Sequence, residues 1–298
     1  MTNFQRRALT ATIFAAVMLV GLFLNMWSFI ILFFVISMGC LWEFLRLTSD
    51  GNKLRKILVF AVAVTLWFTV AYSLLGFKGL GSWDLNRSIG WSNSPSLIWL
   101  FAFPITLFFF PFLLLLFELF QKNEKPFNLV GLSITGIFYT VLPFAFGIPF
   151  LTSKGQSSFD VFSVMSFTPN IVAGILFLTW ANDTFAYIVG SKIGKTPLFP
   201  RISPKKTWEG TVGGGIMCIL TGFGIHHFLG ILSLTDWLVI GGIVAIFGTL
   251  GDLIESMLKR SVGVKDSGSF MPGHGGFLDR FDAFIFVIPF VFLYLMMR

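Results

Sequence analysis

A short polar stretch near the C-terminal end of the sequence carries the residue types of a metal and phosphate site. Residues 256–282 hold three acids, four cations, one histidine and a glycine turn, and the sequence around them is strongly apolar. Carboxylates bind hard cations, Lys and Arg neutralise phosphate oxygens, and glycines let a backbone approach a ligand closely. A membrane protein carries charge at this density mainly where chemistry or ion binding requires it.

The acids of this region have helical spacing. Asp279 and Asp282 are three positions apart, so both face one side of a helix. A second stripe follows from the same rule and consists of Asp252, Glu255, Ser256 and Lys259. Two such stripes facing each other would hold one or two divalent cations through oxygen ligands. For Glu255 a structural ion pair with Lys259, at i,i+4, is an equally good interpretation.

Cations and a histidine accompany these acids. Phosphate charge would be neutralised by Lys259, Arg260, Lys265 and Arg280. His274 lies in the glycine turn 273–276, where it could bind phosphate or transfer a proton. In phosphoryl or nucleotidyl transfer, positioning and charge neutralisation do most of the catalytic work, so this set favours an enzyme of that kind.

Two further polar islands lie upstream. Residues 203–210 stand just before an apolar run, with Glu209 at the membrane boundary. The candidate phosphate-binding donors of this island are Ser203, Lys205, Lys206 and Thr207. A plain positively charged loop with an interfacial tryptophan is the structural alternative. Asp183 interrupts another apolar run and needs a partner, either a metal or a lysine.

The apolar runs predict membrane spans rather than a soluble core. The chain is 55% hydrophobic and 12% charged, whereas a soluble domain has roughly a quarter charged residues. We expect an all-α integral membrane protein with about nine transmembrane helices, at residues 8–24, 27–45, 57–76, 97–119, 129–150, 169–189, 210–232, 235–254 and 279–297. Residues 1–150 would form an N-terminal membrane region of about five spans, and residues 151–298 a catalytic region of about four.

The distribution of lysine and arginine predicts the orientation of these spans. With the N-terminus in the cytoplasm, 17 of the 21 Lys and Arg residues fall on the cytoplasmic side, as the positive-inside rule requires. Acids from four of the spans would then lie at the same depth on the cytoplasmic side, where nucleotides and lipid headgroups can reach them. This topology, together with anionic lipid, accounts for the net charge of +7. A nucleic-acid partner is not expected, because the sequence lacks a basic face with interleaved aromatics.

Several other kinds of site are disfavoured. Cys40 and Cys218 both lie in apolar runs and are expected to be small packing residues, without a disulfide and without Cys-bound zinc. Gly210 and Gly214 have the spacing of a close helix-packing contact. The sequence has no Walker A loop and no GxGxxG motif after a strand, so a nucleotide would not bind through a P-loop or a Rossmann unit.

Read in order, residues 256–282 resemble the signature of the phosphatidate cytidylyltransferase family, the CDP-diacylglycerol synthases. The pattern is Ser256-x-Leu-Lys-Arg-x4-Lys265-Asp266-x-Gly-x-x-Met-Pro-Gly-His274-Gly-Gly-Phe-x-Asp279-Arg-Phe-Asp282. Met271 stands where the family has Leu, Ile or Phe. Residues 182–190, residues 203–210 and the pair Trp42-Glu43 resemble the family too. The likeness is strong in the C-terminal part of the chain and is limited to the pattern of spans in the first half.

The resemblance implies an activity, cofactors and partners. Members of the family join phosphatidate to the CMP part of CTP and release pyrophosphate, with Mg²⁺ and a second cation such as K⁺. Carried over to this chain, the metal ligands would be Asp252, Asp279 and Asp282. Lys259 and Arg280 would contact phosphate with Ser256 nearby, and residues 203–209 would help hold CTP or the headgroup. The other expected substrate contacts are Arg260, Lys265, Asp266, His274 and Asp183.

The resemblance also implies the setting of this reaction. Family members are all-helical membrane proteins with nine spans, and they form homodimers. The compact chain favours a bacterial inner-membrane enzyme with its active site on the cytoplasmic side.

Two other functions fit part of the pattern. A CTP- or ATP-dependent kinase of polyprenol or phytol would use a similar acid-rich helix but would transfer the γ-phosphoryl group. An ion-coupled transporter would use the same acids to carry protons or Mg²⁺. Transporters often show inverted repeats and broken helices in both halves, whereas the polar residues here gather in one half.

Overall fold

The computed structural model describes residues 3–49, 51–77, 95–151, 169–268, 270 and 275–298. Their contacts form two compact units: unit 1 combines residues 1–32 with residues 168–298, and unit 2 consists of residues 33–167. The first helix therefore belongs to the same unit as the C-terminal helices. That residues 151–298 are the catalytic region stays a prediction.

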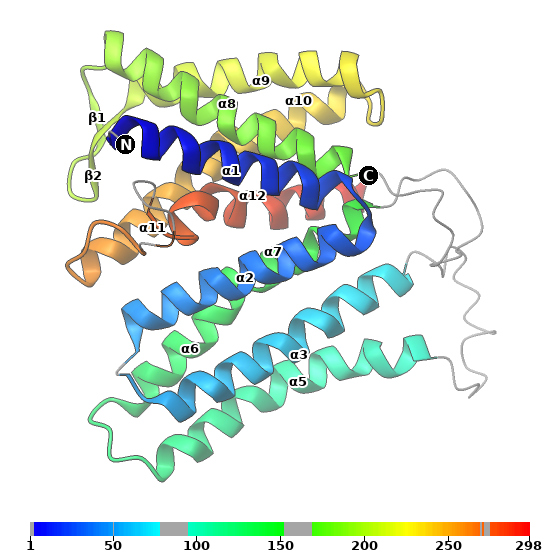
Figure 1. The fold of residues 1–298 in the computed structure, drawn as a ribbon, viewed down its shortest axis with the longest axis vertical. Coiled ribbons are helices and arrows are strands. Elements are labelled where there is room, and N and C mark those ends of the chain that lie inside the picture. Colours follow the sequence, from blue (N-terminus) through cyan, green and yellow to red (C-terminus); the bar gives the residue numbers. More distant parts are fainter. Residues whose placement is uncertain (1–2, 50, 78–94, 152–168, 269, 271–274) are drawn as a thin grey trace. The chain divides into compact units, whose positions relative to one another are not determined.

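Over its described residues, unit 1 consists of helices and one small β hairpin (Figure 1). Its elements are α1 (Asn3–Phe23), the first turns of α2 (Met26–Thr48), α8 (Asn170–Ile193), β1 (Pro197–Phe199), β2 (Ser203–Thr207), α9 (Trp208–Leu229), α10 (Leu234–Ile243), the π-helical turn η3 (Val244–Gly248), α11 (Thr249–Ser261) and α12 (Leu278–Met297). Helix α9 packs against both α8 and α10, and α12 packs on α11 and η3.

Unit 2 is helical over its described residues. Its elements are the remainder of α2, α3 (Lys53–Phe77), α5 (Pro95–Leu119), α6 (Pro126–Thr140), α7 (Leu142–Phe146) and the 3-10 turn η1 (Ile148–Leu151). A buried ion pair joins α3 to α5, with Arg55 Nε donating to Glu118 Oε1 at 2.5 Å. Asn123 Nδ2 donates to the other Glu118 oxygen at 2.6 Å. Hydrogen bonds of this kind offset the desolvation of a buried charge pair.

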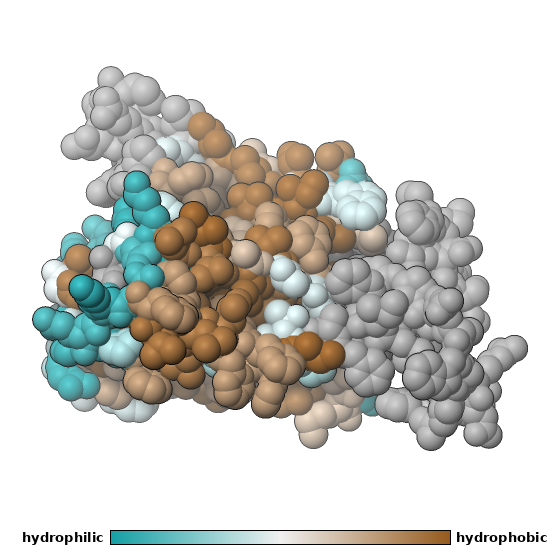
Figure 2. Space-filling view, turned by 90° about the horizontal axis from the view of Figure 1, so that it is seen from below, coloured by the Kyte–Doolittle hydropathy of each residue, from teal (hydrophilic) through white to brown (hydrophobic). Residues whose placement is uncertain are grey.

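Most of the expected spans correspond to helices that could cross a membrane. By length and composition these are Met26–Thr48, Lys53–Ala71, Pro126–Phe146, Asn170–Ile193, Trp208–Leu229, Leu234–Ser261 and Leu278–Met297. Two shorter apolar helices among the described residues, Thr12–Phe23 and Pro104–Leu119, coincide with the first and fourth expected spans. On the face drawn in Figure 2, hydrophobic residues cover the middle and hydrophilic residues gather at one end. The predicted all-α membrane fold is confirmed, whereas the count of nine spans and the cytoplasmic N-terminus stay predictions.

Two local features differ from the expectation. Strands β1 and β2 pair antiparallel, with Pro197 opposite Thr207 and Phe199 opposite Ser203, where only a loop was expected. The helix that holds the eighth expected span does not end near residue 254 but continues through η3 to Ser261 over 28 residues. Polar residues end an apolar run without ending a helix, because the helical hydrogen bonds belong to the backbone. The acids of α11 therefore stand on a continuous helix.

Glycines allow α9 to lie close against α8. A Cβ atom at Gly210 would stand 2.8 Å from the carbonyl oxygen of Ala186, and one at Gly214 would stand 2.8 Å from that of Asn182. Any larger side chain would push the two helices apart. The predicted close packing at Gly210 and Gly214 is confirmed, and it fixes the start of α9 beside the C-terminal half of α8.

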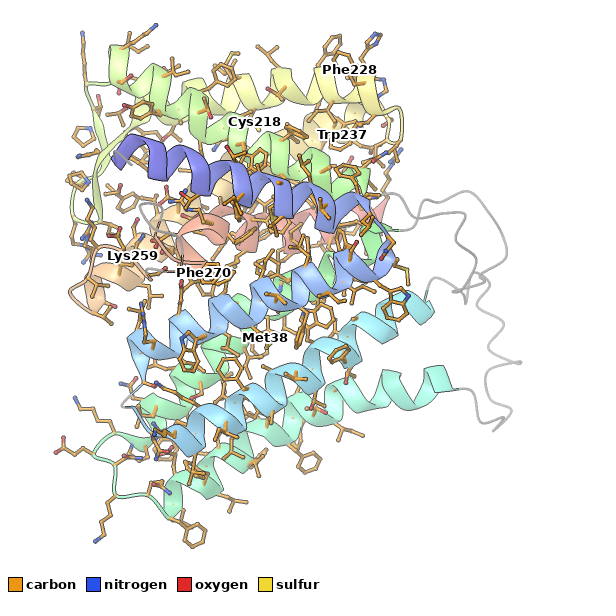
Figure 3. All side chains as sticks on the ribbon, viewed as in Figure 1. Met38, Cys218, Phe228, Trp237, Lys259 and Phe270 are labelled. Atoms are coloured by element: carbon orange, nitrogen blue, oxygen red, sulfur yellow. The ribbon has the colours of Figure 1, made fainter. Side chains whose placement is uncertain are left out.

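Both cysteines are packing residues, as predicted, since the Cys40 and Cys218 side chains are fully buried. Cys218, labelled in Figure 3, lies in unit 1 with its Sγ 3.5 Å from the carbonyl oxygen of Leu178 and 3.4 Å from that of Gly241. These contacts tie α9 to its neighbours on both sides.

Candidate active site

Three carboxylates from two helices form what we call the acid group: Asp252 and Glu255 of α11 and Asp282 of α12. Each offers one oxygen atom, and these atoms lie within 4.8 Å of one another. The two helices meet closely here because Gly251 has no side chain. A Cβ atom on Gly251 would come within 2.5 Å of the carbonyl oxygen of Asp282. The structure thus brings Asp252 and Glu255 of the predicted second stripe together with Asp282 of the first.

Lysines lie at the edge of the acid group. Two unit charges 4.8 Å apart repel each other by roughly 3 kcal/mol at an effective dielectric constant of about 20. Lys206 of β2 forms an ion pair with Asp252, and Lys259 of α11 forms one with Glu255, one turn earlier on the same helix. The lysines offset part of this repulsion, and a divalent cation would offset more of it. The predicted i,i+4 ion pair of Glu255 is therefore present in addition to its place in the acid group.

Asp279 connects α11 to the segment that precedes α12. Lys259, labelled on α11 in Figure 3, donates from Nζ to Asp279 Oδ1 at 2.7 Å. Asp279 Oδ2 accepts from the backbone N and the Oγ of Ser267, both at 3.0 Å, and from Gly276 N at 2.7 Å. Both oxygens of Asp279 are thus used by the protein. Its predicted role as a metal ligand stays a prediction.

The glycine turn approaches this same carboxylate. Gly275 has φ of +82°, in the left-handed region that favours glycine, and a Cβ atom there would collide with the Asp279 side chain. The backbone at Gly275 therefore approaches Asp279 closely, and the predicted approach of the turn to a ligand stays a prediction. His274 and Gly273 lie outside the described residues, so the role predicted for His274 stays a prediction.

The polar island 203–210 folds into β2 and the first turn of α9. Thr207 is the N-cap of α9, and its Oγ1 accepts from Gly210 N at 3.2 Å. The Glu209 carboxylate accepts from the backbone N–H groups of Lys195 and Thr196, at 3.1 and 3.2 Å. Ser203 is half-buried and Lys205 is exposed. Among the contacts described for this island, the ion pair of Lys206 is the one that reaches the acid group.

Two more predicted residues stand near the acid group. Ser256 Oγ donates to Asp252 Oδ1 at 3.3 Å. Asp183 of α8 lies within electrostatic range of Lys206, Asp252 and Arg280. Helix α8 therefore adds a further carboxylate to the electrostatic surroundings of the site, and the substrate-binding role predicted for Asp183 stays a prediction.

The remaining predicted residues lie on exposed surface around the site. Arg280 is exposed in the first turn of α12. Arg260 Nη1 donates to the carbonyl oxygen of Val264 at 3.3 Å, which closes the turn after α11. Lys265 and Asp266 are exposed on the segment that follows. These side chains are accessible to a substrate.

Ser267 and Gly251 contribute to the site and were not singled out from the sequence. Ser267 is fully buried, and its two hydrogen bonds reach a carboxylate 12 residues further along the chain. Gly251 lets α11 lie close to the α12 backbone, because it has no side chain. Both depend on contacts between segments that are separate in the sequence, and no spacing rule within one helix indicates them.

The whole chain matches a known protein family, the cytidylyltransferase family, over residues 5–298. The chain belongs to this family. The phosphatidate cytidylyltransferase of Bacillus subtilis strain 168 is 33% identical over 268 residues, which are 85% of this chain and 92% of that protein. Membership in the cytidylyltransferase family confirms the resemblance found in residues 256–282.

Two staphylococcal relatives match shorter parts of the chain. The phosphatidate cytidylyltransferase of Staphylococcus aureus strain COL is 46% identical over 114 residues, which are 38% of this chain and 44% of that protein. That of Staphylococcus saprophyticus is 39% identical over 171 residues, 54% of this chain and 66% of that protein. The chain thus spans less than half the length of the first relative and about two thirds of the second.

Proposed function

We propose that this chain transfers CMP from CTP to phosphatidate, giving CDP-diacylglycerol and pyrophosphate. The observation that carries the proposal is the acid group Asp252, Glu255 and Asp282 with Lys206 and Lys259 at its edge. A site with both signs of charge suits a reaction in which two phosphate groups must meet around a cation. Relatives named phosphatidate cytidylyltransferase support the choice of substrates.

The acid group fits a divalent cation such as Mg²⁺. Three carboxylate oxygens within 4.8 Å of one another are hard ligands of the kind that this ion takes. We expect Asp252, Glu255 and Asp282 to hold the cation, with Asp279 as a further predicted ligand. When bound, the cation supplies charge neutralisation of the phosphates and of the pyrophosphate leaving group. A second cation such as K⁺ is part of the proposal on the family resemblance alone.

The protein's own groups bind and orient the two substrates. A phosphate oxygen of phosphatidate is already anionic at neutral pH, so it attacks the α-phosphorus of CTP without a strong general base. A bond forms between that oxygen and the α-phosphorus, and the bond from the α-phosphorus to pyrophosphate breaks. Because both reactants are anions, the barrier is largely electrostatic. Lys206, Lys259 and Arg280 would supply positive charge, and Asp279 would hold Lys259 in place.

The proposal includes a location and an assembly. Seven apolar helices among the described residues support a multi-pass membrane protein, and bacterial relatives support the inner membrane. We place the acid group on the cytoplasmic side, where CTP is available, on the basis of the positive-inside distribution of Lys and Arg. A homodimer is expected from the family resemblance alone.

A labelling experiment tests the reaction. The purified protein in detergent receives phosphatidate, Mg²⁺ and CTP labelled at either the α or the γ phosphorus. We expect the label to enter the lipid from α-labelled CTP alone, with pyrophosphate released. Entry from γ-labelled CTP alone would mean a lipid kinase instead. Entry from neither, in a protein shown to be folded, would contradict the proposal and favour the transporter.

A further inference from the structure

Glu209 joins the two ends of the β hairpin. It lies in the first turn of α9, directly after β2, and its carboxylate accepts from the N–H groups of Lys195 and Thr196, which lie between α8 and β1. Each of its two oxygens takes part in this contact. A carboxylate that accepts backbone N–H groups in this way makes charge-assisted hydrogen bonds, which are roughly twice as strong as neutral ones.

Other contacts hold the same junction together. Trp208 N donates to the carbonyl oxygen of Thr196 at 2.9 Å, and Thr207 pairs with Pro197 across the hairpin. Gly194 is packed so tightly that a Cβ atom on it would stand 2.5 Å from Thr207 Oγ1. The end of β2 is therefore fixed to the end of α8 at several points, and Glu209 provides side-chain hydrogen bonds among them.

This junction determines where Lys206 stands. Lys206 is the residue before Thr207, and its ammonium group forms the ion pair with Asp252 of the acid group. A lysine on a four-carbon stem keeps one position only if its backbone is held. The geometry points to Glu209 as a positioning residue: it holds the β hairpin so that Lys206 meets Asp252, and it does not contact substrate. The kinetic test of this role rests on the proposed function, because it measures CMP transfer. The distance test does not depend on that function.

A double-mutant cycle on transfer activity tests whether the effect of Glu209 depends on Lys206. We expect Glu209→Ala to lower kcat/KM about 10- to 100-fold, which is the loss typical when a residue that orients a site residue is removed. Glu209→Gln, which keeps one acceptor oxygen, should lose less. If Glu209 acts through Lys206, the double variant Glu209→Ala with Lys206→Met should be no slower than Lys206→Met alone. Losses that multiply in the double variant, or a Gln variant as slow as the Ala variant, would overturn the inference.

A distance measurement tests the positioning without any activity. Arg201 at the tip of the hairpin and Met257 on α11 are exposed, and the native Cys40 and Cys218 are buried. Spin labels on Arg201→Cys and Met257→Cys therefore report the hairpin-to-α11 distance by electron–electron double resonance. We expect a narrow distribution in the otherwise native protein and a broad one with Glu209→Ala. An equally narrow distribution would overturn the inference, and failure of CMP transfer in the native protein would count against the proposed function alone.

Discussion

Replacing Asp282 by asparagine is expected to lower the rate of CMP transfer at least about 100-fold while the protein stays folded. Asparagine has nearly the size of aspartate, and its Oδ1 can still accept the Ala283 N–H, which Asp282 Oδ1 accepts at 2.8 Å. The substitution therefore removes one negative charge from the acid group and little else. The measurement is the initial rate of label transfer from α-labelled CTP to lipid.

The control for this variant is Glu124→Gln, which makes the same chemical change at an exposed carboxylate between α5 and α6. It should keep the native rate. Thermal unfolding of both variants in detergent separates a loss of chemistry from a loss of fold. A near-native rate for Asp282→Asn would show that the acid group does not take part in the reaction.

Replacing Lys259 by methionine is expected to remove both activity and stability. Glu255 is fully buried, and the Lys259 ammonium is its counter-charge as well as a hydrogen-bond donor to Asp279. Removing one partner of a buried ion pair costs about 3–5 kcal/mol in the free energy of unfolding. The measurement is chemical or thermal unfolding in detergent, alongside the transfer rate. Lys265→Met, at an exposed lysine on the segment after α11, is the stability control.

A second substitution separates the two effects of Lys259. Adding Glu255→Gln to Lys259→Met removes the buried charge that was left without a partner, so most of the stability should return. The transfer rate should stay low, because the positive charge near the phosphates is still missing. A double variant no more stable than the single one would contradict the assigned ion pair.

The membrane helices and the acidic helices could be predicted from the sequence. Long apolar runs identify the spans because a chain in hydrocarbon must form its backbone hydrogen bonds internally, as a helix does, and must present apolar side chains to the lipid. The spacing of Asp252 with Glu255, and of Asp279 with Asp282, indicates a shared face because side chains three apart lie on one side of a helix. The residue types alone then suggest a cation and phosphates.

The detailed roles of the acids could not be predicted, because they depend on contacts between elements. Asp279 and Asp282 have the same type and share a helix face, yet Asp282 joins the acid group while Asp279 binds Lys259, Ser267 and Gly276. Hydropathy could not show that α11 continues past residue 254.

The hairpin was missed for a related reason. Strands β1 and β2 are short, and a pair of this size is held by its neighbours rather than by its own sequence. The resemblance implied that residues 203–209 help hold CTP or the headgroup, and for Glu209 that expectation stays a prediction. The structure shows that its carboxylate accepts from two backbone N–H groups.

The central claim is that Asp252, Glu255 and Asp282 hold the divalent cation of the reaction, and cation binding itself is its most direct test. Mn²⁺, which can replace Mg²⁺ at oxygen ligands, is titrated into the purified protein and free Mn²⁺ is followed by electron paramagnetic resonance. We predict a binding site in the native protein that is lost in the double variant Asp252→Asn with Asp282→Asn, and kept in Glu124→Gln. Unchanged Mn²⁺ affinity in a folded double variant would contradict the account.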